Sequence, residues 1–343
     1  MEGLIELFPA AEGLVREAAP SNYTMLFEDY AKTLGSPSPM GERPIVATQA
    51  HFLERFNTRH RDVLSRLREV RSTRSCGWFV AGGSVLGALL QRSTPAASDS
   101  DVDIFVFARA GSADERQRLA SRLARRIFDA LARDDEMWHV NRSRFVINLR
   151  RGDEDDTEPP VQIVLRLYDS PTEVLLGFDV DCCCVGYDGQ HVYALPRVRA
   201  PPCTALPPQP PLHAPRAPTV AQALRALRHG FVVCNPLHSW PNQPTYELRL
   251  AKYASRGFAV AVPGLNLEGV NVLRATTEAA LPKLRGVARL LLLHAELQTR
   301  LKQSAQSGRS VPTLREMYGQ VCLFSGYGPG AHDQARPTVT VAD

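Results

Sequence analysis

The chain has 343 residues, of which 44% are hydrophobic and 22% are charged. This balance predicts a soluble globular protein with one large core or two smaller ones, and it excludes a disordered or fibrous chain. The net charge of +4 is the margin of 40 basic over 36 acidic residues, too small to predict a surface coated by nucleic acid. The acidic N-terminus and the short apolar runs predict no export signal and no membrane contact, so we expect a cytoplasmic protein.

The N-terminal residues 1–70 are predicted to form an extension that ends in a helix. Residues 1–44 mix proline, glycine and serine with short apolar pieces. Over residues 48–70 the apolar side chains recur at helical spacing, which predicts one long amphipathic helix. The side chains that define this stripe are Phe52, Phe56, Val63, Leu67 and Val70.

The first half of the core, residues 71–195, begins with a strand, a turn and a helix. The apolar run 77–81 ends at Gly82-Gly83, and a helix start follows it. Residues 101–107 alternate acidic and apolar side chains before becoming fully apolar, which predicts a central strand with one end at a site. Ser112 and Glu115 form a capping box, so an amphipathic helix is expected over 112–133.

The second half of the core is rich in β-branched residues. Strands are expected at 145–149, 161–168 and 178–187, and after a turn at 188–189 also at 191–195. The cysteine run 182–184 falls in the third of these segments. Neighbouring strand side chains point to opposite faces and cannot all bind one ion, so we expect reduced, buried thiols without a metal.

The last third of the chain changes in composition. Nine residues of the segment 196–218 are proline, which predicts a linker or surface loop. Helical periodicity beyond it predicts a mainly α-helical domain over 219–325, followed by a flexible tail at 326–343. The helices are expected at 219–231, 246–256 and 284–303. The predicted fold class is therefore α+β, a mixed sheet flanked by helices and followed by a helical domain.

Two short motifs in the core carry chemistry. Asp101 and Asp103 begin a predicted strand, whose period of two places both carboxylates on one face. Mg²⁺ prefers hard oxygen ligands and keeps substrate phosphates in its shell, so this pair suits Mg²⁺ or Mn²⁺ bound together with a nucleotide. Upstream, Gly82, Gly83 and Ser84 at a strand-to-helix junction offer backbone N–H groups to a phosphate. Each motif alone is a common structural feature; their order and context favour function.

Together the two motifs resemble the signature of the DNA polymerase β-like nucleotidyltransferase superfamily, over about residues 77–195. The segment 80–90 is similar to the head of CCA-adding enzymes, but Leu86 stands where those enzymes usually carry Arg, so no CCA-adding activity is expected. The chain is more similar to viral and phage nucleotidyltransferase-like proteins, some of which are fused to ankyrin repeats. That similarity lies in residues 161–164, 178–182 and 252–258.

The resemblance implies a nucleotidyltransferase-type fold and a reaction. An acceptor hydroxyl would attack the α-phosphate of an NTP in line, with two Mg²⁺ ions bound and pyrophosphate leaving. Asp101 and Asp103 would bind the metal, and a third carboxylate would come from Asp179. Asp181, two residues on, would share the strand face of Asp179 and is the alternative. Asp99 extends the acidic run, which leaves the exact metal geometry open.

Basic residues of the predicted helix 246–256 are candidates for holding the triphosphate. Arg249, Lys252 and Arg256 lie three and four residues apart and therefore share one helical face. A solvated basic stripe is the alternative interpretation of this pattern.

Two other classes of function compete with the transferase. The first is a catalytically inactive module that keeps the nucleotidyltransferase fold and binds a nucleotide or a protein partner. The second is a helical protein that binds nucleic acid through its Arg-rich C-terminal half. The sequence contains no zinc-enzyme, serine-hydrolase or P-loop motif. The acceptor of the transferase stays open between an RNA end, a small molecule and a protein side chain.

Overall fold

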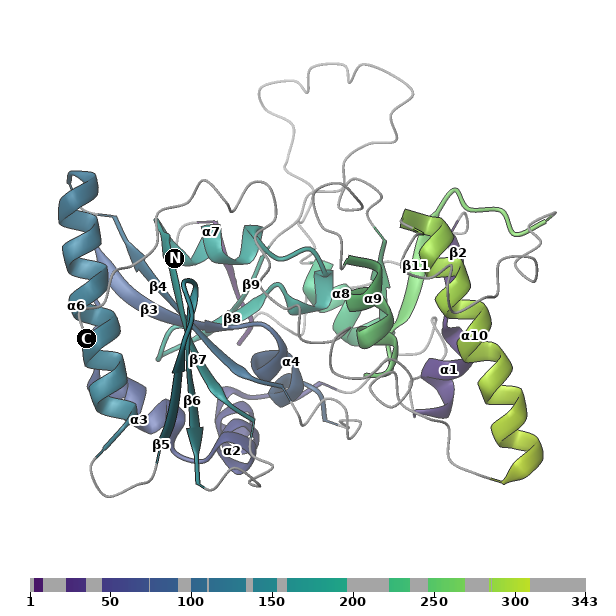
Figure 1. Cartoon of the computed structure of the whole chain (residues 1–343), viewed down its shortest axis with the longest axis horizontal. Helices are drawn as coiled ribbons and strands as arrows, with labels where there is room; N and C mark the ends of the chain where they lie inside the picture. Colours follow the sequence, from purple (N-terminus) through teal and green to yellow (C-terminus); the bar gives the residue numbers. More distant parts are fainter. Residues whose placement is uncertain are drawn as a thin grey trace, which may run out of the picture.

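The computed structural model describes residues 3–8, 23–34, 45–73, 75–91, 100–109, 111–133, 138–152, 159–195, 222–234, 246–268, 284 and 286–308. An eight-stranded sheet and a three-stranded sheet form two lobes that lie side by side along the long axis of the molecule (Figure 1). The large lobe comprises the described parts of residues 45–195 together with 3–8. The small lobe comprises residues 23–34 and the described parts of 222–308. The predicted linker 196–218 and tail 326–343 lie outside the described residues.

The large sheet is mixed and runs in the order β1-β9-β8-β3-β4-β7-β6-β5. β4 pairs with β7 in parallel, and the other neighbours pair antiparallel. β7 has the bounds that the sequence predicts. The strands are β1 Ile5–Glu6, β3 Cys76–Ala81, β4 Val102–Ala108, β5 Trp138–Arg142, β6 Val146–Arg151, β7 Val161–Tyr168, β8 Val185–Tyr187 and β9 Val192–Ala194.

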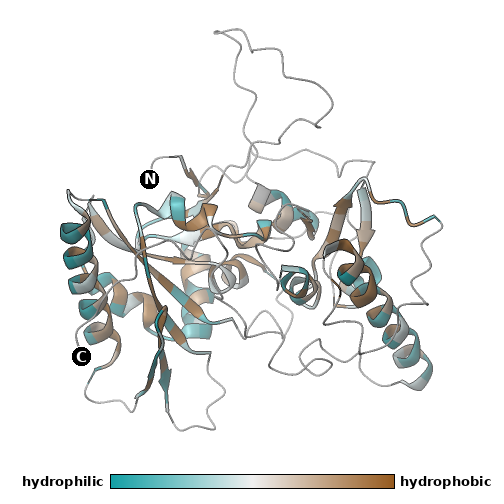
Figure 2. Cartoon of the chain, turned by 45° about the horizontal axis from the view of Figure 1, so that its top comes forward, coloured by the Kyte–Doolittle hydropathy of each residue, from teal (hydrophilic) through white to brown (hydrophobic). Residues whose placement is uncertain are grey.

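Helix α6 (Ala113–Leu131) covers one face of this sheet and packs on β3, β4 and β7. The predicted N-cap is confirmed at its N-terminus, where Ser112 Oγ accepts a hydrogen bond from the backbone N–H of Glu115 at 3.3 Å. Leu123 and Ile127 belong to its buried stripe, while its outward face is hydrophilic (Figure 2). The short helices α4 (Gly83–Leu89) and α7 (Pro171–Leu176) also belong to the large lobe.

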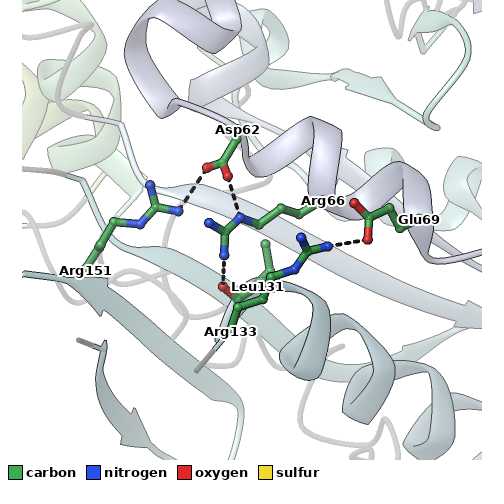
Figure 3. A network of polar contacts seen from close by, with 6 residues as sticks. All are labelled: Asp62, Arg66, Glu69, Leu131, Arg133 and Arg151. Atoms are coloured by element: carbon green, nitrogen blue, oxygen red, sulfur yellow. Dashed lines mark hydrogen bonds and ion pairs between the residues drawn. The ribbon is translucent and has the colours of Figure 1, made fainter. Parts of the chain in front are cut away.

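The prediction of one long helix over 48–70 is wrong, because the chain turns sharply in the middle of that segment. α2 (Gln49–His60) and α3 (Val63–Glu69) are separated at Arg61, whose φ of 47° is left-handed. Asp62 fixes the turn: it accepts hydrogen bonds from Arg66 at 2.5 Å and from Arg151 of β6 at 2.9 Å (Figure 3). Both helices bury apolar side chains, so the periodicity continues across the break and hides it.

The α3 network also reaches α6. Arg66 Nη1 donates to the carbonyl oxygen of Leu131 at 2.9 Å, and Arg133 forms an ion pair with Glu69 (Figure 3). Arg66 is buried, so its charge depends on Asp62 for compensation.

The predicted strand 178–187 is wrong in its first part. Only β8, at its end, is a strand; Asp181–Cys183 form a 3-10 helix, η2. The N–H groups of Cys183 and Cys184 bond to the carbonyl groups of Val180 and Asp181, which closes a helical turn. The cysteine run is therefore buried for a different reason than predicted, since η2 packs against α4 and against α8 (Gln222–His229).

The small lobe is mainly helical, as predicted, and contains α8 (Gln222–His229), α9 (Tyr246–Ala254) and α10 (Gly286–Ser307). It also holds a sheet of β10 (Phe231–Val233), β11 (Ala259–Pro263) and β2 (Tyr23–Leu26). β2 comes from the N-terminal segment, and α1 (Glu28–Thr33) packs on α10. None of the described helices has the length and apolar character to cross a membrane.

Candidate active site

The glycine turn follows the end of β3 and lies beside the small lobe. Gly82 has φ of 92° and ψ of −139°, a backbone conformation that is unfavourable for any residue with a Cβ atom. A Cβ atom added at Gly83 would lie 2.9 Å from Ser100 Oγ and 3.1 Å from Arg256 Nη1. One added at Gly82 would lie 3.7 Å from Asp103 Oδ2. The absence of side chains here therefore lets a carboxylate and a guanidinium approach the same turn.

The two predicted carboxylates lie at the neighbouring strand end. Asp103 is on β4, opposite Ala81 of β3, and Asp101 comes immediately before the strand. Asp101 Oδ2 accepts a hydrogen bond from Gln162 Nε2 of β7 at 3.1 Å. Burial raises the pKa of Asp101, while the charges of Lys252 and Arg256 lower it. The carboxylate is therefore partly desolvated and lies near cations, a setting in which interactions between charges are stronger than in water.

Helix α9 and the turn after it supply those cations from the small lobe. Burial lowers the pKa of Lys252 to about 8, aided by Arg256 and opposed by Asp101 and Asp103. Arg256 is only 4% exposed and lies over the ring of Tyr253, 5.0 Å from its centroid. Lys252 therefore lies near both carboxylates, and Arg256 lies near Asp101 and beside the glycine turn.

Asp179 and Arg249, both predicted site residues, contact each other. Asp179, just before η2, forms an ion pair with Arg249 of α9, and the two side chains are 11% and 26% exposed. Asp181, the alternative third carboxylate, accepts a hydrogen bond from the N–H of Val233 at 3.3 Å. Within the described ranges, no three His, Cys, Asp or Glu side chains gather closely enough to hold a metal ion. The structure brings together Asp101 and Asp103 as a pair.

Phe178 links this segment to the glycine turn. Its ring packs against the ring of Phe105 on β4, with centroids 5.8 Å apart, and lies 3.3 Å from a Cβ atom built at Gly82. Asp179, the next residue along the chain, therefore lies close to the glycine turn, although its carboxylate is paired with Arg249.

The donor set fits a hard cation. Asp101 and Asp103 offer carboxylate oxygens at the end of one strand, and no thiolate or imidazole lies with them in the part of the chain that the structure describes. Sequence reasoning missed Gln162, which orients Asp101. Its signal was available, because Gln162 is the polar residue of an otherwise apolar strand segment, Val161 to Leu165.

Comparisons with known proteins bear on the same region. Residues 49–199 match the sequence profile of the Gabija anti-defense 2 family. Over 201 residues the chain is 26% identical to an uncharacterized protein of Acanthamoeba polyphaga mimivirus, which covers 55% of this chain and 36% of that relative. The chain therefore spans about a third of the length of this curated relative.

Two solved structures show partial similarity. The non-canonical poly(A) polymerase complex GLD-2–GLD-3 is 12% identical, covering 43% of this chain and 40% of that chain with a TM-score of 0.25. The E. coli MS115-1 CdnC:HORMA-deltaN complex is 17% identical, covering 48% and 44% with a TM-score of 0.22. At these TM-scores no residue-by-residue correspondence follows.

Proposed function

We propose that the chain is a metal-dependent nucleotidyltransferase, which moves an NMP from an NTP to an acceptor hydroxyl and releases pyrophosphate. The observation that carries this proposal is that Lys252 and Arg256 lie near Asp101, beside a glycine turn that Asp103 and Arg256 both approach. A site that places two carboxylates near two cations suits a triphosphate bound together with a divalent cation.

The carboxylates would hold Mg²⁺ or Mn²⁺. When bound, the cation neutralises phosphate charge and makes an acceptor hydroxyl nucleophilic near neutral pH. Gln162 holds one oxygen of Asp101, which fixes the direction of the carboxylate. Ser84 is 1% exposed, and its Oγ has no hydrogen-bond partner among the described residues. This hydroxyl would donate a hydrogen bond to a phosphate oxygen.

The cations of the small lobe would bind the triphosphate. At pH 7 Lys252 stays protonated, since its pKa is about 8, and a bound polyanion would raise that pKa back toward its ordinary value. The planar guanidinium of Arg256 can donate two parallel hydrogen bonds to a phosphate. Because these residues and the carboxylates come from different lobes, the nucleotide would also bridge the lobes.

A second candidate is a catalytically inactive module that binds nucleotides. It is favoured by the ion pair between Asp179 and Arg249, which occupies the residue that the superfamily resemblance assigns as third carboxylate. Such a module would bind NTP without releasing pyrophosphate. The match to the Gabija anti-defense 2 family supports a role in countering the Gabija defence for either candidate.

The proposal is tested with each of the four NTPs labelled at the α-phosphate, supplied with Mg²⁺ or Mn²⁺ and with cellular RNA, protein or small hydroxyl compounds as acceptors. We expect metal-dependent transfer of the label for at least one combination, and its loss when a chelator is added. Binding of NTP with no transfer in any combination would favour the inactive module.

A further inference from the structure

A row of amide side chains crosses the large sheet from the carboxylate pair to the edge strand. Asp103 on β4 lies in register with Gln162 on β7, and Gln162 with Asn148 on β6. Asn148 lies in turn opposite Asn141 on β5. Residues opposite one another on neighbouring strands share a face of the sheet. With strands about 4.8 Å apart, the row is about 14 Å long.

The row starts at the candidate active site and opens to solvent. Gln162 and Asn148 are half-buried, and Asn141 is exposed. Gln162 contacts Asp101 directly. Arg150, two residues from Asn148 and thus on the same face, is exposed, and its charge lowers the pKa of Asp101. A ligand lying on this face would therefore end at the carboxylates.

The opposite face of these strands is already covered. Val102, Val161 and Leu149 lie in register with one another, and they line a small cavity together with Arg61 and Val63 from the α2–α3 junction. Since side chains alternate between the faces of a sheet, the amide row faces away from α3. Among the described residues, this leaves the polar face for a ligand at this edge.

The β5–β6 hairpin is basic. Residues 138–151 include four arginines and one histidine but no aspartate or glutamate. Arg151 is held by Asp62 and lies over the ring of Trp138, 4.9 Å from its centroid. Arg144 and Arg150 are exposed. An amide row beside exposed arginines suits a long ligand in which phosphates and hydrogen-bonding groups recur at regular intervals.

We propose that this face binds a single-stranded polynucleotide as the acceptor, with its terminal hydroxyl at Asp101 and Asp103. Arg150 pairs with backbone phosphate, and the amides of Asn141 and Asn148, which both donate and accept, bind sugar hydroxyls or base edges. The length of the row favours an extended acceptor over a small hydroxyl compound. The role of the terminal hydroxyl rests on the proposed transferase function, whereas the binding surface does not.

The test is the fluorescence anisotropy of a labelled single-stranded RNA of about 12 nucleotides, and of DNA with the same sequence, measured without NTP. The full chain is compared with the variant Asn148→Ala/Arg150→Gln. Arg122→Gln, on the exposed face of α6, is the matched control for loss of one positive charge. We expect at least about ten-fold weaker binding for the double variant, a shallower salt dependence, and no change for the control. Stronger binding of one nucleic acid identifies the acceptor as RNA or DNA.

Each outcome decides the inference. Absence of binding by the wild-type chain, or an equal loss in Arg122→Gln, would overturn it. If Asn148→Ala disturbs folding, Asn141→Ala on the exposed edge strand replaces it with the same expected direction. Pyrophosphate release without oligonucleotide binding would refute this acceptor and leave the transferase intact. Oligonucleotide binding without pyrophosphate release under any condition would refute the transferase and leave the binding surface.

Discussion

Gln162 on β7 donates a hydrogen bond from Nε2 to Oδ2 of Asp101, over 3.1 Å. The bond links β7 to the residue that precedes its parallel neighbour β4, so the start of one strand is fixed by the side chain of the next. Partners of this kind around a metal ligand typically change metal affinity or activity by about 10–100-fold.

Replacing Gln162 tests that positioning. In Gln162→Leu, Asp101 keeps its charge but loses its donor, so we expect about ten-fold slower transfer and a higher Mg²⁺ concentration for half-maximal rate. The measurement is the rate as a function of Mg²⁺ concentration. Gln162→Glu should be worse than Gln162→Leu, because a second carboxylate would repel Asp101. Unchanged Mg²⁺ dependence in Gln162→Leu would contradict the positioning role.

The pair of Asp179 and Arg249 predicts a loss of stability. Arg249→Met would leave the carboxylate of Asp179 buried without its cation, which should lower the free energy of unfolding by about 3 kcal/mol. Asp179→Asn with Arg249→Met should cost less than the sum of the two single changes, measured by urea unfolding. If Asp179 instead acts as a metal ligand, Asp179→Asn would raise the Mg²⁺ requirement as strongly as Asp103→Asn does.

A side chain added at the glycine turn should weaken NTP binding, whereas one added at a glycine far from the site should affect only stability. In Gly83→Ala the new methyl group would meet Ser100 and Arg256 at 2.9 and 3.1 Å, so Arg256 must shift. We expect about ten-fold weaker NTP binding by calorimetry, because the guanidinium no longer meets the phosphates. Gly264→Ala is the control, since Gly264 also has positive φ but nothing within 4 Å. It should cost about 1 kcal/mol of stability with no change in NTP affinity.

The buried imidazole of His60 makes stability depend on pH. Burial, aided by Arg59, lowers the pKa of His60 from 6.5 to about 4 in the folded chain. Between pH 6.5 and 4 the unfolded chain therefore binds a proton that the folded chain does not, and stability falls as the pH falls. Lowering the pH across this whole range should reduce the free energy of unfolding by about 3 kcal/mol. Unfolding of wild type and His60→Leu at pH 7 and pH 4.5 checks this, since the variant should lose less stability than wild type.

The sequence predicted the parts of the site that lie close together along the chain. The Gly82 turn is recognisable because glycines interrupt an apolar run before a helix start, and Asp101 and Asp103 because a strand alternates its side chains. The same local rules predicted the cap at Ser112 and the bounds of β7. Local rules failed at Arg61, where a left-handed residue breaks a continuous apolar stripe.

Contacts between distant segments were beyond local patterns. Periodicity cannot indicate that β2 pairs with β11, more than 200 residues away. Nor can it distinguish a buried 3-10 turn from a strand, so the strand on which Asp179 and Asp181 were expected to share a face is not there. The basic face of α9 was recognised as a pattern, but Arg249 pairs with Asp179, while Lys252 and Arg256 lie near Asp101.

The central claim is that Asp101 and Asp103 carry the transfer of a nucleotide. The most direct test is the rate of pyrophosphate release with Mg²⁺ or Mn²⁺ for the wild type, Asp101→Asn and Asp103→Asn, with Asp169→Asn as the matched control. Asp169 lies on the surface in an ion pair with Arg116, and its side chain is 53% exposed. We predict release by the wild type and the control, and a loss of about 100-fold or more in both site variants. Equal release by all four chains would contradict the claim.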